Sequence, residues 1–236
     1  MLKTFFSFII WPIWYTFFIP SLFFLFMTIL LFPKKILHYF VRPICWMYCF
    51  FAGQWLIKIN SPPKKDGGPY LYMFNHVSMF DQFMIGAFIP HYITAVAAIE
   101  VFKYPVFGFI IKKYGVIPII RQKIRKAIGS LNLAEEAIKR GTSFLISPEG
   151  TRTLTGDIGP FKKGPFHLAK NTNATIVPLA LKGGFKAKKK SDWRVQPGIL
   201  TVVFGDPIES SQFATLSIKD LQKLVQKRIL ELKKVS

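Results

Sequence analysis

The segment 143–152, SFLISPEGTR, joins an apolar run to a polar turn that contains glycine. A short apolar run bounded by turn residues is typical of a buried strand, so we expect a strand over 143–147. A second run, at 70–75, has the same form and leads into NHVSMFD at 75–81. Both segments therefore predict buried strands that end in polar residues.

Further short apolar runs alternate with stretches of helical periodicity along the chain. This alternation predicts an α/β fold with a largely parallel sheet flanked by helices. The other predicted strands are 93–97, 115–120, 175–181 and 199–204. The predicted helices are 80–89, 100–113, 121–140, 162–171 and 217–233. Open parallel sheets bind ligands at the carboxyl ends of their strands. The polar segments 75–81 and 147–152 are therefore expected to form a site together.

His76 and Asp81, five residues apart, are a candidate general base and the carboxylate that orients it. The carboxylate would accept a hydrogen bond from Nδ1 and stabilise the imidazolium, while Nε2 removes a proton from a hydroxyl. The same spacing also arises by chance, and Asp81 would then only begin the first turn of the next helix. We expect Ser78 to cap that helix.

The chain of 236 residues is long enough for one sizeable core in addition to a membrane anchor. Its 32 Lys and Arg outnumber 12 Asp and Glu, giving a net charge of +20. Such a charge favours anionic partners: a phospholipid surface, a phosphorylated substrate, an acidic carrier protein or nucleic acid. Basic residues cluster only at 186–190 and no nucleic-acid motif is present, so we expect no nucleic-acid partner.

The amino-terminal part of the chain predicts a membrane anchor. Residues 5–32 contain no charged side chain. A helix of that length would extend about 42 Å, more than the roughly 30 Å of a bilayer core. Pro12 and Pro20 leave two arrangements open, a kinked span and a segment that enters and leaves one leaflet. Residues 36–53 fit an interfacial helix, so 1–54 are expected to form the anchor, as a helix or a helical hairpin.

Basic residues indicate the orientation of this anchor. Lys34, Lys35 and Arg42 follow the first apolar segment, which places the rest of the chain on the cytoplasmic face of the cell (inner) membrane. Lys3 precedes the first apolar segment and weakens this charge asymmetry. A hairpin topology, with both ends of the anchor on one side of the membrane, therefore stays open. The two thiols, Cys45 and Cys49, make no zinc site without further ligands, and the four histidines are scattered along the chain, so no metal site is expected.

Four ordered motifs resemble those of the glycerolipid acyltransferases typified by 1-acylglycerol-3-phosphate acyltransferase. The resemblance covers roughly residues 55 to 210. The first motif, N-H-x-x-x-x-D, is matched by Asn75, His76 and Asp81. The second is matched in part, by Glu100, Pro105, Gly108, Gly115 and Arg121. The third is matched by Pro148, Glu149, Gly150, Thr151 and Arg152, and the fourth by Ile176, Val177, Pro178, Leu179 and Ala180.

The resemblance implies that 55–236 form an acyltransferase domain in which His76 and Asp81 are catalytic. It also implies a set of substrate-binding residues: Arg121, Glu149, Gly150, Thr151 and Arg152. The two arginines suit a phosphate, because guanidinium binds such oxyanions in a bidentate manner. We expect Glu149 to shape its loop by bonding backbone N–H groups or an arginine, and Gly150 to allow an unusual torsion or a close approach.

The function that the resemblance implies is O-acyl transfer from an acyl thioester to a lysolipid at the phospholipid bilayer. The acceptor would be 1-acyl-glycerol-3-phosphate, giving phosphatidate in phospholipid biosynthesis. The co-substrate would be acyl-coenzyme A or acyl-acyl carrier protein, with no cofactor. Ala98 stands where the family has a phosphate-binding lysine, which keeps another lysolipid open as acceptor, either a lysophospholipid or an amino-acid lysolipid. A rival function is non-catalytic binding of anionic lipid or nucleic acid at the membrane.

Overall fold

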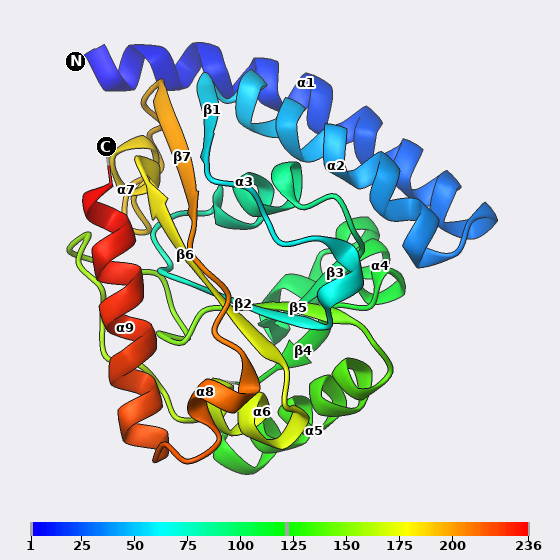
Figure 1. Cartoon of the computed structure of the whole chain (residues 1–236). Coiled ribbons are helices and arrows are strands. Elements are labelled where there is room, and N and C mark those ends of the chain that lie inside the picture. The colour runs from blue at the N-terminus through cyan, green and yellow to red at the C-terminus, as the bar shows by residue number, and fades with distance from the viewer. Residues whose placement is uncertain (1, 121–122, 236) are drawn as a thin grey trace.

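A seven-stranded sheet forms the centre of the protein (Figure 1), whose computed structural model describes residues 2–120 and 123–235. Its strands lie in the order β1-β7-β6-β2-β5-β3-β4. They are β1 (Gln54–Ile59), β2 (Tyr70–Phe74), β3 (Ile93–Ala98), β4 (Ile117–Ile119), β5 (Ser143–Ile146), β6 (Thr175–Lys182) and β7 (Gly198–Phe204). Only the β6–β7 pair is antiparallel in this sheet, so the predicted, largely parallel α/β fold is confirmed.

The edge strand β1 is the one strand of this sheet that the sequence did not predict. It pairs only with β7 and leaves Trp55 and Ile57 exposed, with Lys58 beside them. Exposed aromatic and charged residues break the short apolar pattern that marks the buried strands, which explains the omission.

Side chains of β2 alternate between two cores. Tyr70, Tyr72 and Phe74 belong to a core shared with the amino-terminal helices, whereas Leu71 and Met73 belong to a core on the other face. This is the two-residue period of a strand that is covered on both sides. The first face packs against α1 (Leu2–Leu31), α2 (Lys34–Phe51) and α3 (Asp81–Phe88). The second packs against α5 (Ile124–Lys139), α6 (Gly164–Thr172), α8 (Ser210–Phe213) and α9 (Ile218–Lys234).

The helix predicted over 100–113 is divided in two. A 3-10 helix, Ile99–Lys103, is followed by α4 (Pro105–Tyr114), with Tyr104 extended between them. Proline disfavours helical torsions in the residue before it and suits the first position of a helix. Pro105 therefore ends one helix and begins the next. Two short elements complete the fold: the 3-10 helix Lys65–Gly67, and α7 (Gly184–Ala187).

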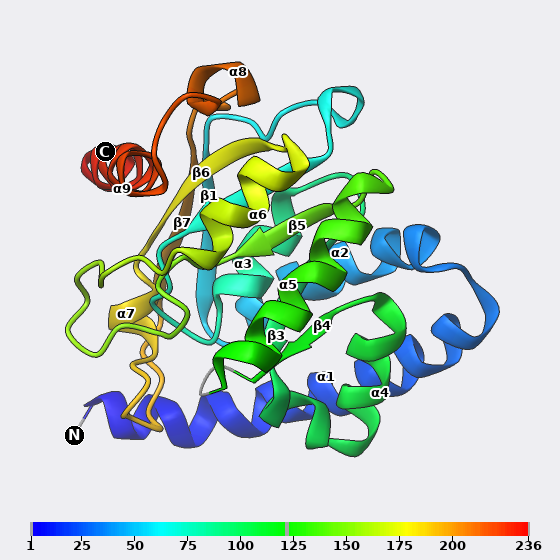
Figure 2. The ribbon, with the colours of Figure 1, turned by 90° about the horizontal axis from the view of Figure 1, so that it is seen from below.

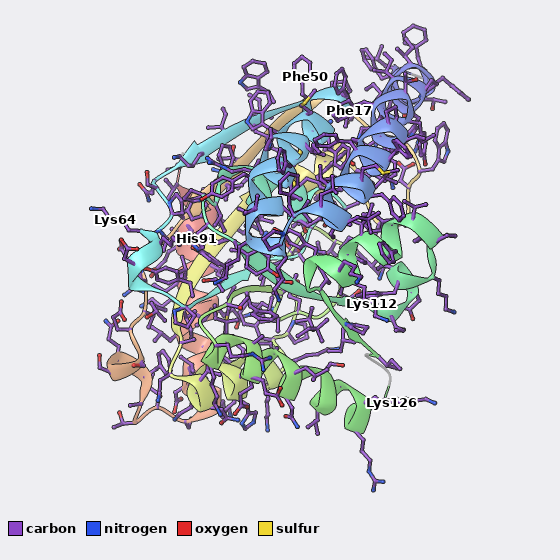
Figure 3. The ribbon with its side chains drawn as sticks, turned by 90° about the vertical axis from the view of Figure 1, so that its right-hand side faces the viewer. Phe17, Phe50, Lys64, His91, Lys112 and Lys126 are labelled. Carbon is purple, nitrogen blue, oxygen red and sulfur yellow. The ribbon has the colours of Figure 1, made fainter. Side chains whose placement is uncertain are left out.

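α1 and α2 pack side by side as a hairpin along one side of the molecule (Figures 1 and 2). One stripe of α1 is buried, at the spacing that brings helical residues onto one face: Ser7, Ile10, Trp14, Ser21, Leu25 and Thr28. The other faces of α1 expose large apolar side chains, including Ile19 and Phe23 at 64% and 62%. Figure 3 shows Phe50 of α2 on the side of the molecule that carries the helical hairpin, far from Lys126 of α5.

α1 is the one described helix that is long and apolar enough to cross a membrane. It nevertheless shares a core with the sheet: Ile10, Trp14 and Leu25 belong to the same buried cluster as Leu200 and Val202 of β7. The predicted division into an anchor, 1–54, and a domain, 55–236, stays a prediction. We infer from the shared core that removing the anchor would expose apolar surface of the body.

His91 is buried near the amino end of β2. Its Nε2 bonds the hydroxyl of Tyr72 at 3.1 Å, and its Nδ1 has no hydrogen-bond partner among the described residues. Burial, with smaller contributions from His38 and Lys65, lowers the pKa of His91 from 6.5 to about 4. The folded protein therefore holds this ring neutral where an unfolded chain would protonate it.

We predict that the free energy of unfolding falls as the pH is lowered from about 6.5 to about 4. In that window the unfolded chain takes up a proton that folded His91 does not, giving a slope of up to about 1.4 kcal/mol per pH unit. His91→Phe should flatten this dependence, measured by urea unfolding in detergent. Replacing exposed His167 is the control. An unchanged slope in His91→Phe would show that other groups cause the acid sensitivity.

Candidate active site

His76 and Asp81 lie in direct contact at the carboxyl end of β2. Nδ1 of His76 is 2.6 Å from Oδ2 of Asp81, which is the first residue of α3 and is fully buried. An ionised carboxylate can only accept, so Nδ1 carries the proton and Nε2 is left with a lone pair. The His76 side chain remains 18% exposed. This is the geometry that a general base with an orienting carboxylate requires.

The Asp81 carboxylate also organises the turn before it. It accepts hydrogen bonds from the backbone N–H of Val77 at 2.8 Å and of Ser78 at 3.0 Å. Ser78 does not cap α3, contrary to the prediction. Its hydroxyl instead donates to the carbonyl of Lys188 at 3.0 Å. Asp81 does occupy the first turn of the helix, so its structural role and its contact with His76 coexist.

Glu149 holds the backbone of His76. One carboxylate oxygen accepts from the N–H of His76 at 2.7 Å, and the other accepts from the N–H of Gly159 at 2.8 Å. The N–H of Thr153 donates to the carbonyl of His76 at 2.8 Å. Both backbone polar groups of His76 are therefore bonded to the loop after β5. The expectation that Glu149 bonds backbone N–H groups is confirmed. Burial raises the pKa of Glu149, and these bonds oppose the shift.

Gly150 and Asn75 give these loops their shape. Gly150 has φ +69°, the left-handed region that glycine enters without strain, and a Cβ there would lie 3.1 Å from the Lys162 side chain. The amide of Asn75 bonds Leu181 of β6 twice: its Nδ2 donates to the carbonyl at 3.0 Å, and its Oδ1 accepts from the N–H at 2.7 Å. The loop of His76 is thereby tied to a third strand end.

Gly184 is part of this arrangement, although no motif marked it. A Cβ at Gly184 would lie 2.9 Å from Val77 and 3.1 Å from the Cβ of Ser78. Only a glycine allows α7 to approach the turn so closely. The sequence carried no signal for this contact, because it joins segments about a hundred residues apart.

Two further predicted substrate-binding residues, Thr151 and Arg152, lie on the loop after β5. Thr151 is exposed and Arg152 is half-buried. None of the ion pairs in the described part of the chain involves Arg152. Arg121 lies outside the described residues. The structure therefore brings His76, Asp81 and the loop of Glu149, Gly150, Thr151 and Arg152 to one edge of the sheet.

A family model described as Acyltransferase matches residues 57–182, a range that includes His76, Asp81 and the loop of Arg152. The chain belongs to the acyltransferase family. It is 35% identical over 186 residues to the 1-acyl-sn-glycerol-3-phosphate acyltransferase of Cocos nucifera, covering 76% of this chain and 60% of that protein. The chain thus spans less than two thirds of the length of that relative.

Two further similar proteins are matched over a larger share of their own length. The probable 1-acyl-sn-glycerol-3-phosphate acyltransferase of Mycoplasma pneumoniae is 28% identical, over 84% of this chain and 78% of that protein. The crystal structure of the 1-acyl-sn-glycerophosphate acyltransferase of Thermotoga maritima has a TM-score of 0.83 and 19% identity, covering 99% of both chains. At this identity the likeness shows the fold, including the helices that precede the sheet.

We predict that Glu149→Gln disturbs the position of His76. A carboxylate accepts both N–H groups, whereas an amide has one acceptor oxygen and would turn its own NH2 towards the second donor. Leaving one buried N–H unpaired should lower the free energy of unfolding by about 1–3 kcal/mol.

The free energy of unfolding is measured by urea titration, and the turnover of acyl transfer is measured alongside it. Both quantities should fall in Glu149→Gln. Glu136→Gln is the matched control, because the Glu136 side chain is 62% exposed on α5. Wild-type stability and turnover in Glu149→Gln would contradict the role assigned to this carboxylate.

Proposed function

We propose that the protein transfers an acyl chain from an acyl thioester to the free hydroxyl of 1-acyl-glycerol 3-phosphate, giving phosphatidate. The observation that carries this proposal is the 2.6 Å contact between His76 and buried Asp81, which leaves Nε2 available as a base. Membership of the acyltransferase family and the names of the relatives support the same reaction. The acyl donor would be acyl-coenzyme A or acyl-acyl carrier protein.

The reaction would begin with Nε2 of His76 removing the proton of the acceptor hydroxyl. The hydroxyl oxygen attacks the thioester carbonyl carbon, and the carbon–oxygen bond of the new ester forms through a tetrahedral intermediate. The carbon–sulfur bond then breaks, and the imidazolium returns its proton to the leaving thiolate. Asp81 stabilises the imidazolium through Nδ1 while the proton is on the ring. The acyl group passes directly between the two substrates, without a covalent enzyme intermediate.

Arg152 is the proposed contact for the anionic group of the acceptor. It follows Thr151 on the loop whose Glu149 holds His76, so a headgroup bound there would lie close to the base. Guanidinium donors match the oxygens of a phosphate in number and geometry. Another lysolipid stays the alternative acceptor, since Ala98 replaces a lysine that the family resemblance associates with phosphate. An acceptor screen with purified protein distinguishes these.

The exposed apolar faces of α1 and α2 are the proposed contact with the lipid bilayer. Only 22% of the most apolar stretch of α1 is buried within the protein. Exposed apolar patches of this extent mark a membrane or a partner. A protein that uses a lysolipid needs such a contact, because its acceptor resides in the bilayer. We place the active site on the cytoplasmic face of the cell membrane, where acyl thioesters are available.

We predict that His76→Ala lowers turnover by at least roughly a hundredfold, because it removes the general base. Asp81→Asn should also lower turnover severely, because an amide cannot fix the same tautomer. The measurement is formation of labelled phosphatidate from 1-acyl-glycerol 3-phosphate and acyl-coenzyme A, with exposed His167→Ala as control. Near wild-type turnover in folded His76→Ala would overturn the mechanism. If the wild type itself formed no labelled phosphatidate, the proposed function would be overturned.

We predict that the double variant Ile19→Asp with Phe23→Asp binds phospholipid vesicles at least roughly tenfold more weakly than the wild type. Two carboxylates on the exposed face of α1 oppose burial in hydrocarbon. Vesicle flotation measures this, and Leu133→Asp on α5 is the control, since Leu133 is 53% exposed away from the hairpin. Equal loss of binding in both variants would mean that the α1 face has no special role.

A further inference from the structure

The segment 188–195, which follows α7, is bonded to the turn that carries the catalytic pair. The carbonyl of Lys188 accepts the hydroxyl of Ser78, whose N–H in turn bonds Asp81. The ammonium of Lys188 is turned into its own loop, where it donates to the carbonyls of Lys189 and Asp192. The backbone of this segment is therefore fixed beside the candidate active site.

The same segment is fastened to the amino-terminal end of α1. Lys3 lies 3.3 Å from the carboxylate of Asp192, and Trp11 donates its indole N–H to the carbonyl of Trp193 at 3.0 Å. Ser7 accepts from the N–H of Val195 at 2.9 Å. Figure 2 shows the chain after α7 reaching from the sheet to this end of α1. The segment thus lies between the helix with the exposed apolar face and the candidate active site.

Lys190 extends from this segment onto the loop after β5. Its ammonium donates to the hydroxyl of Thr151 at 3.0 Å, next to Arg152 in the sequence. Burial and then the charge of Arg152 lower the pKa of Lys188. The Lys162 side chain crosses the same loop, with its ammonium 3.1 Å from where a Cβ of Gly150 would lie. Lys162 and Lys190 therefore approach the loop of residues 149–152, which carries the charge of Arg152 itself.

The neighbouring carboxylates are already engaged elsewhere. Glu149 accepts two backbone N–H groups, and Asp81 holds His76. Asp192 accepts from Arg194 at 2.9 Å and pairs with Lys3. Within the described residues, no ion pair involves Lys162 or Lys190. The loop thus presents positive charge that no ion pair of the described residues neutralises. Lys190 itself makes one neutral contact, with the hydroxyl of Thr151.

We propose that Lys190, together with Arg152, binds a phosphate group that a substrate carries. The proposal rests on the function proposed above, because it assigns a further residue to that same site. A phosphomonoester carries close to two negative charges, so one arginine does not neutralise it. Lys190 adds the second charge, and the Thr151 hydroxyl, which only accepts in its bond with Lys190, keeps its own O–H to donate to the phosphate.

The position of the segment favours the acceptor as the source of this phosphate. Trp193 is 52% exposed and packs its ring 5.5 Å from that of Phe8 on α1. Tryptophan is enriched where a membrane surface meets water, which is the depth of a lysolipid headgroup. A soluble acyl donor also carries phosphates but does not need a site fixed to α1. The acyl donor is therefore the other source that the experiment must separate.

The test compares Lys190→Gln with Lys189→Gln. Both variants lose one positive charge, so both change the general attraction to anionic vesicles equally. Lys189 lies over the ring of Phe185 at 5.0 Å, and among the described residues it is Lys190, not Lys189, whose ammonium bonds Thr151. We expect Lys190→Gln to raise KM for 1-acyl-glycerol 3-phosphate roughly fivefold to tenfold, with kcat little changed, as for an exposed charge-assisted contact. Lys189→Gln should match the wild type, and Lys190→Arg should retain a low KM.

The source follows from which KM rises. A rise for 1-acyl-glycerol 3-phosphate, absent with the uncharged acceptor 1-monoacylglycerol, supports the site and assigns it to the acceptor. A rise confined to acyl-coenzyme A supports the phosphate site and assigns it to the donor. Equal KM values in Lys190→Gln, Lys189→Gln and the wild type overturn the proposal.

Calorimetric binding of sn-glycerol 3-phosphate to the full chain in detergent separates this proposal from the function on which it rests. If the wild type transfers no acyl chain but binds sn-glycerol 3-phosphate more tightly than Lys190→Gln does, the function fails while the phosphate site stands. If acyl transfer is present and neither this binding nor any KM depends on Lys190, the function stands and the site is wrong.

Discussion

The contact between Asp81 and His76 is the interaction on which the rest of the candidate site depends. A fully buried carboxylate is unfavourable unless it is paired and hydrogen-bonded. Asp81 meets that requirement with the imidazole of His76 and with the N–H groups of Val77 and Ser78. Satisfying this one carboxylate therefore closes the turn after β2 and fixes the ring at the same time. Stability of the turn and orientation of the imidazole arise from the same bonds.

Strand order explains why other segments can support this turn. β2 lies between β5 and β6, and all three run parallel, so their carboxyl ends meet at one edge. From β5 comes Glu149, which holds the backbone of His76; from β6 comes Leu181, which pairs with Asn75. The chain after β6 then continues through α7 into the segment 188–195, which is hydrogen-bonded to α1. In this way the helix with the exposed apolar face is connected to the loop beside His76 and Asp81.

Much of this could be predicted from the sequence because it depends on local patterns. Apolar runs marked β2 to β7, and the segments 75–81 and 147–152 followed two of them directly. The rest depends on contacts between distant segments. Gly184 fits against Val77 because β6 lies beside β2, and Lys190 donates to Thr151, 39 residues earlier in the chain. The cap expected from Ser78 was wrong because its hydroxyl found a partner at Lys188, 110 residues away.

The protonation of His76 in the free protein tests the central claim most directly. Nitrogen-15 NMR of histidine-labelled protein, at a pH where the ring is neutral, reports which ring nitrogen carries the proton. Comparison with His76→Gln identifies the signal of His76 among the four histidines. The contact with Asp81 predicts a proton on Nδ1 and an unprotonated Nε2. A proton on Nε2 would contradict it, since the ring could then neither be oriented by Asp81 nor act as the base.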